Sequence, residues 1–91
     1  MIHSGEMMKP YERVAAVASK SDLIGFVEAL RDDFQRNPTS WENRTLEQYL
    51  SALASWLEDS DGYYLNQGRE IPASPSWRNV ADMLMAATMY E

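Results

Sequence analysis

Cysteine is absent from this chain of 91 residues, and histidine occurs only once, as His3. There is consequently no disulfide, no thiolate metal site and no cysteine nucleophile. The lack of disulfides also disfavours a secreted protein, because small secreted domains usually depend on them. His3 lies in a polar N-terminal stretch that offers little to hold it in place, so we expect neither a catalytic triad nor a histidine-rich metal site. We therefore predict a protein without enzymatic activity and without a cofactor.

Basic residues are also scarce, because 8 lysines and arginines stand against 14 aspartates and glutamates, for a net charge of −6. This balance repels phosphate backbones and anionic lipid surfaces, so we expect neither nucleic-acid nor membrane binding. The sequence also lacks a signal peptide and any apolar run near the roughly 20 residues that cross a bilayer. We expect a cytoplasmic protein. The charge permits a basic protein partner, although net acidity most often serves solubility.

What the chain does contain is enough apolar sequence for one folded domain. Its 45% hydrophobic and 11% aromatic content is typical of a globule rather than of a disordered chain. Residues 1–9 mix polar residues and Gly5 with short apolar pairs such as Met7-Met8, and are interpreted as a flexible leader. We predict a single helical domain over residues 10–91.

The strongest helix signal lies between Trp41 and Leu57. Thr45 and Gln48 have the capping-box spacing, in which each side chain satisfies a backbone N–H at the start of a helix. The apolar residues that follow recur at steps of three and four and so share one helical face. These residues are Leu46, Tyr49, Leu50, Leu53, Trp56 and Leu57.

Similar patterns predict three further helices. Pro10 suits the first turn of a segment over 10–18, although its run of valine and alanine is also compatible with a short strand. Ser21 or Asp22 is expected to cap a helix over 22–36, which ends before Pro38. The last helix is expected over 75–90, with Ser74-Pro75 as its cap and first residue.

The resulting fold prediction is all-α: a small irregular four-helix bundle, with helices at 10–18, 22–36, 45–58 and 75–90 and a long ordered loop before the last one. The core is expected to contain the three tryptophans together with six aliphatic and aromatic side chains of the helices. These residues are Trp41, Trp56, Trp77, Phe26, Leu30, Leu50, Leu53, Val80 and Leu84.

The segment from Glu58 to Pro75 combines acidic residues with glycine, proline and two adjacent tyrosines. An EF-hand calcium loop beginning at Asp59 fails, because Tyr64 would occupy the position where the turn needs glycine. A solvated acidic turn is the better interpretation. Since the acidic residues would follow a helix C-terminus, where negative charge is disfavoured, Arg69 or a cation from a partner is expected to relieve them.

These features favour a small non-catalytic protein-binding module, whose target would be a basic protein such as a toxin. The alternative is a small-molecule-binding domain whose pocket is framed by the 58–75 loop. The candidate partner or ligand surface combines aromatic residues at segment edges with the acidic run and its neighbours. It comprises Trp41, Glu42, Asn43, Glu58, Asp59, Asp61, Tyr63, Tyr64, Arg69 and Trp77.

The last helix carries more apolar surface than one neighbour can cover. Met83, Met85, Met89 and Tyr90 lie outside its main apolar stripe. Either the long loop folds back over this second face, which gives a monomer, or a second copy of the chain covers it, which gives a homodimer through the last helix.

Several short motifs in a fixed order resemble those of a family of small bacterial proteins of unknown function. They are W-E-N at residues 41–43, the Tyr63-Tyr64 pair, P-S-W at residues 75–77 and the closing Tyr90-Glu91. The similarity extends over roughly residues 20–91. It implies a single, mostly helical domain, and it supplies no activity, cofactor or catalytic residue to assign to this sequence.

Overall fold

Helices form all the regular structure of residues 9–90, which are the residues that the computed structural model describes. His3 and the predicted leader up to Met8 lie outside the described residues. The α-helices are α2 (Pro10–Arg13), α3 (Lys20–Arg36), α4 (Leu46–Asn66) and α5 (Trp77–Ala86), and two short 3₁₀ helices are η1 (Val14–Ala16) and η2 (Pro38–Ser40). Within residues 9–90 there is no strand, so the all-α prediction is confirmed and the first segment is helical.

Serine and threonine side chains begin the three long helices. Thr45 and Gln48 form the predicted capping box at the start of α4, with Thr45 Oγ1 accepting from the Gln48 N–H at 3.0 Å. The other two predicted caps are wrong by a few residues. Ser19, rather than Ser21 or Asp22, caps α3. Ser76, rather than Ser74, caps α5, so Pro75 precedes the helix instead of opening it.

Helix α4 is much longer than predicted, because it continues through Glu58 and Gly62 to Asn66. The residue that ends it is Gly68, whose φ of +69° favours glycine, and the turn is closed by an Arg69 N–H to Tyr64 O hydrogen bond of 2.9 Å. The predicted loop over 58–75 is therefore limited to residues 67–76, and the acidic run belongs to a helix instead of a turn.

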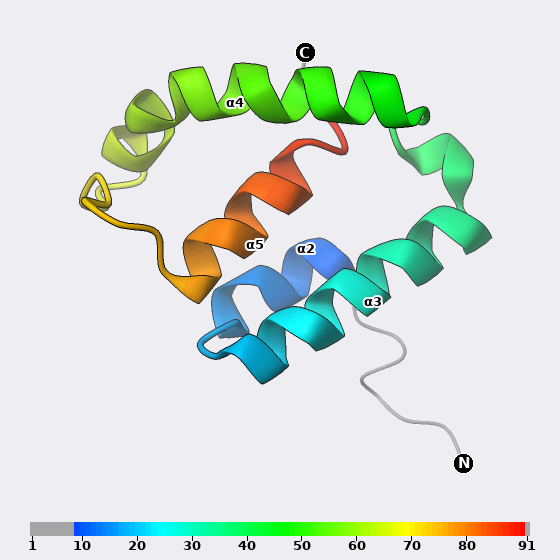
Figure 1. Cartoon of the computed structure of the whole chain (residues 1–91), viewed down its shortest axis with the longest axis horizontal. Coiled ribbons are helices and arrows are strands. Elements are labelled where there is room, and N and C mark those ends of the chain that lie inside the picture. Colours follow the sequence, from blue (N-terminus) through cyan, green and yellow to red (C-terminus); the bar gives the residue numbers. More distant parts are fainter. Residues whose placement is uncertain (1–8, 91) are drawn as a thin grey trace.

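Helix α5 lies between α3 and α4 and contacts both of them (Figure 1). The main core lies where α5 meets α3 and η1, and consists of Val17, Phe26, Leu30 and Ala81. Trp56 and Ala52 are buried on the face of α4 that carries Tyr49 and Tyr63. Helix α5 approaches α4 obliquely from one side (Figure 1), and several large apolar residues of α4 stay exposed.

The burial of the expected core residues follows from this arrangement. Trp56, Phe26 and Leu30 are buried as predicted. Trp41, Leu53, Val80 and Leu84 are only half-buried. The prediction is wrong for Leu50, on the uncovered flank of α4, and for Trp77, which is 44% exposed because it opens α5. Among the described residues, no helix has the length and apolarity to span a bilayer.

Candidate functional site

The W-E-N turn holds the C-terminal end of α5. The Asn43 side-chain amide donates to Ala87 O at 2.9 Å and to Tyr90 O at 2.8 Å. The backbone N–H groups of Glu42 and Asn43 both donate to Thr88 O at 3.0 Å. The last carbonyls of a helix have no partner within it, so the turn supplies the missing donors. Asn43 is therefore a structural residue, whereas the side chain of Glu42 is exposed.

Replacing Asn43 by alanine is expected to lower the free energy of unfolding by about 2 kcal/mol, because two partly buried carbonyls lose their donor. Urea denaturation measures the change. Asn66→Ala is the control, since Asn66 is exposed, and it should alter stability by less than about 0.5 kcal/mol. Equal effects of the two substitutions would show that the capping bonds contribute nothing.

Trp41 lies in an aromatic cluster that joins three helices. Its ring is 4.9 Å from that of Phe34 on α3 and 5.9 Å from that of Tyr49 on α4, measured between centroids. Its indole N–H donates to Asp33 Oδ2 at 2.8 Å. The Tyr49 hydroxyl in turn donates to Leu84 O of α5 at 2.7 Å, and burial raises the pKa of Tyr49 to about 12. These bonds fix the orientation of both rings.

The same cluster lines an open groove of about 540 Å³ between α3 and the first half of α4, which we call the α3–α4 groove. Its walls are mainly apolar, and two arginines stand among the lining residues. The lining consists of Val27, Leu30, Arg31, Phe34, Gln35, Trp41, Asn43, Arg44, Thr45, Leu46, Tyr49 and Leu84. Of the predicted surface, Trp41 and Asn43 belong to this groove.

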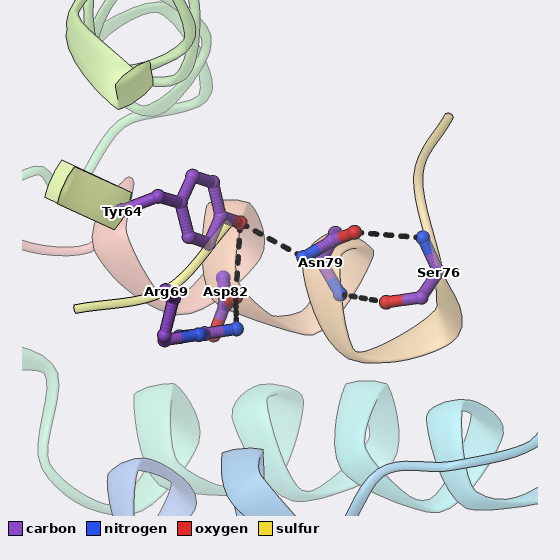
Figure 2. Close-up of polar contacts among 5 residues, drawn as sticks. All are labelled: Tyr64, Arg69, Ser76, Asn79 and Asp82. Atoms are coloured by element: carbon purple, nitrogen blue, oxygen red, sulfur yellow. Dashed lines mark hydrogen bonds and ion pairs between the residues drawn. The ribbon is translucent and has the colours of Figure 1, made fainter. Parts of the chain in front are cut away.

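Tyr64 and Arg69 belong to a different structure, a polar network around Asp82 of α5 (Figure 2). The Tyr64 hydroxyl donates to Asp82 Oδ2 at 2.9 Å, and Arg69 Nη2 donates to the same oxygen at 3.1 Å. The Arg69 guanidinium also lies over the Tyr64 ring, 4.8 Å from its centroid. Asp82 and Tyr64 are only 4% and 3% exposed, so the placement of Tyr64 on a partner or ligand surface is wrong.

The network keeps the Tyr64 hydroxyl protonated and joins the end of α4 to the start of α5. Burial is the main cause that raises the pKa of Tyr64 to about 12, and the hydrogen bond to Asp82 adds to it. Asn79 Nδ2 donates to the same hydroxyl at 3.2 Å and Asn79 also completes a capping box with Ser76. The arrangement is an anchor, because the Asp82 carboxylate is inaccessible to a substrate from solvent.

Three of the four acidic residues of the predicted surface, Glu58, Asp59 and Asp61, lie on α4. Asp59 accepts a hydrogen bond from the Tyr90 hydroxyl, and this bond is the main cause that raises the pKa of Tyr90. Glu58 and Asp61 are exposed. Arg69 is directed to Asp82 instead of to this run, so the expectation that it relieves these carboxylates is wrong.

Helix α4 carries a row of leucines that is largely exposed, although two of them, Leu50 and Leu53, were predicted as core. Leu46, Leu50 and Leu57 are 73%, 52% and 48% exposed, and Leu53 is half-buried. We call these four residues the α4 leucine stripe. Their spacing of four, three and four residues places them along one flank, beside the face with Tyr49 and Trp56 that meets α5. The apolar residues of α4 span a wider arc than one neighbour can cover, which is the signal that sequence reasoning missed.

Trp77 stands apart from both networks. It lines a shallow cavity of about 400 Å³ together with Val17, Ala18, Pro75, Ser76, Arg78 and Val80. The predicted surface is thus divided among the groove, the Asp82 network, the acidic side of α4 and the start of α5. Within residues 9–90, no group of three or more histidine, aspartate or glutamate side chains is arranged to hold a metal ion.

Comparison with known proteins identifies a family but no activity. A family model described as a family of unknown function (DUF7660) matches residues 19–91. No curated protein and no solved structure matches the chain. The match agrees with the extent of the resemblance noted in the sequence.

Proposed function

We propose that this chain, which belongs to that family of unknown function, is a non-catalytic protein-binding module of the bacterial cytoplasm. Its docking surface is the outer flank of α4, and its partner is a basic protein, such as a toxin that it neutralises. The observation that carries the proposal is the α4 leucine stripe, an uncovered apolar row on the longest helix. Contiguous exposed apolar residues with a polar border are typical of interaction sites.

The charges around the stripe favour a basic partner. Helix α4 contains four carboxylates and neither lysine nor arginine. Glu47 follows Leu46 directly, and Asp61 lies one helical turn beyond Leu57, on the same flank. Glu47, Glu58 and Asp61 are all exposed, so the charges that α4 itself presents beside the apolar row are negative. Such a surface speeds association with a positive patch and discriminates against acidic proteins.

We expect Leu50→Ser combined with Leu57→Ser to weaken partner binding at least tenfold without unfolding the protein, because both side chains are about half exposed. The partner is recovered by affinity purification with the full chain, identified and then titrated as a purified protein. Ile24→Ser with Ile71→Ser is the matched control, since it removes two equally exposed aliphatic residues elsewhere. Affinity should fall with salt. Recovery of no basic protein, or binding indifferent to salt, would contradict the proposal.

The assembly proposed here is a monomer before the partner binds, with a homodimer through the last helix as the alternative. Met85 packs against the main core, and Tyr90 is bonded to Asp59 of α4. Helix α4, rather than the predicted loop, thus covers part of the second face of α5. Met89 remains 55% exposed and is the residue that a second copy would cover. Sedimentation at micromolar concentration distinguishes the two states.

The alternative function is small-molecule binding in a pocket framed by a loop over residues 58–75. The first half of that segment is helical, so it does not supply the loop that this pocket requires. The specific observation that favours ligand binding is instead the α3–α4 groove, which is formed by other residues.

A further inference from the structure

The lining of the α3–α4 groove has the opposite charge to the whole chain. Arg31 and Arg44 are among its lining residues, and no aspartate or glutamate is. The chain as a whole carries six more acidic than basic residues. The groove therefore combines an apolar wall with a positive rim, which suits a ligand with an apolar body and an anionic end.

We propose that the α3–α4 groove binds a free long-chain carboxylate, that is, a single fatty-acid anion. The aliphatic tail lies along Leu30, Phe34 and Trp41, and the carboxylate meets the two arginines. This binding site is separate from the docking surface proposed for α4 and does not depend on it, although Leu46 borders both.

The apolar wall is held in place before any ligand arrives. Trp41 is fixed by its bond to Asp33 and by its contact with Phe34, and Tyr49 is fixed by its bond to Leu84 O. A wall that does not need to be ordered on binding costs little conformational entropy. The volume of about 540 Å³ lies in the range of pockets that bind one small molecule.

Both arginines line the groove and are exposed, and the hydrogen bonds within residues 9–90 leave their terminal nitrogens unused. The bonds described for them use only Nε: Arg44 Nε donates to Trp41 O at 3.1 Å, and Arg31 Nε pairs with Asp32 Oδ1 at 3.2 Å. The Arg31–Asp32 pair is solvent-exposed, and such pairs are weak. The terminal nitrogens of a guanidinium form paired hydrogen bonds to a carboxylate. A carboxylate ligand therefore gains two partners without breaking a buried contact.

A free acid is favoured over a lipid in a bilayer. The net charge of −6 repels anionic membrane surfaces, and the acidic flank of α4 borders the groove. A soluble single-chain anion escapes this repulsion, because only its carboxylate has to reach the two arginines.

The test is calorimetric titration of the full chain with dodecanoate below its micelle concentration, with dodecyltrimethylammonium as a cation of the same chain length. We expect saturable binding of one dodecanoate per chain, roughly tenfold weaker binding of decanoate, and much weaker binding of the cation. Arg31→Gln with Arg44→Gln should weaken dodecanoate about tenfold or more. Lys9→Gln with Lys20→Gln removes the same charge from exposed residues outside the lining and should leave affinity unchanged.

A second variant tests the groove without altering charge. Val27→Phe introduces a larger side chain into the lining from an exposed position, and it should abolish binding while the protein stays folded. The proposal is overturned if dodecanoate binding does not saturate, if the cation binds as well as dodecanoate, or if the arginine variant binds dodecanoate as well as the unchanged protein. It is also overturned if Leu50→Ser with Leu57→Ser alone removes dodecanoate binding, because that result would indicate adsorption to the α4 leucine stripe. Preference for anionic vesicles, or for an acidic amphipathic peptide with no binding of dodecanoate, would also overturn it.

Discussion

Replacing Asp82 by alanine is expected to lower the free energy of unfolding by about 3–5 kcal/mol, which is a large part of the stability of a small domain. Asp82 is buried and accepts from both Tyr64 and Arg69. Without its carboxylate, the Arg69 guanidinium stays partly buried with no anionic partner, and the Tyr64 hydroxyl loses its acceptor. Urea denaturation followed by circular dichroism measures the loss.

Two further variants separate the ion pair from a general effect of losing a carboxylate. Asp61→Ala removes an exposed carboxylate of α4 and should change stability by less than about 0.5 kcal/mol. Arg69→Met and Asp82→Leu combined with Tyr64→Phe should recover most of the stability, because all three groups that shared the network become apolar and Arg69 Nη1 already has no acceptor among the described residues. If Asp82→Ala were as mild as Asp61→Ala, the network would not hold α4 to α5.

The helices of this fold could be predicted because their signals are local. The capping box at Thr45, the period of α3 and the stop before Pro38 depend on residues a few positions apart. The cap of α3 shows the limit of this reasoning. Both Ser19 and Ser21 are good caps, and the choice is made by Asp22, whose carboxylate accepts from the Ala18 N–H at 3.0 Å while its own N–H donates to Ser19.

The extension of α4 could not be predicted, because a tertiary contact decides it. Gly62 costs about 1 kcal/mol within a helix, and the acidic run next to it is typical of a turn. Both costs are offset by the burial of Tyr64 and its bond to Asp82, a residue 18 positions further along the chain. Local propensity favoured a loop, and long-range packing favoured a helix.

The sequence identified individual residues of the candidate site but did not show which of them lie together in space. Asn43, Tyr64 and Ser76 all belong to the motifs that suggested the family, and each has a partner on α5 or just after its end. Their roles are structural, which sequence alone cannot distinguish from binding. Leu50 was assigned to the core for the same reason: periodicity shows which residues share a face, whereas the number of neighbours decides how much of that face is covered.

Raising the pH from 10 to 12 is expected to destabilise the fold through Tyr49 and Tyr64. The pKa of each hydroxyl is raised from 10.0 to about 12 by burial. In the unfolded chain both groups lose their protons near pH 10, whereas in the folded chain they keep them until about pH 12. The stabilising contribution is therefore complete below pH 10 and is lost as the pH rises through 12.

The measurement is urea denaturation at a series of alkaline pH values, with tyrosinate absorbance recorded in parallel. Tyr49→Phe and Tyr64→Phe should each flatten the decline above pH 10, because phenylalanine has no proton to lose. Tyr11→Phe is the control, since Tyr11 is 65% exposed and should leave the profile unchanged. Titration of every tyrosine near pH 10 in the folded protein would contradict this prediction. The contacts of α4 with α5 would then not keep the hydroxyls of Tyr49 and Tyr64 protonated, and neither could be interpreted as a fixed donor.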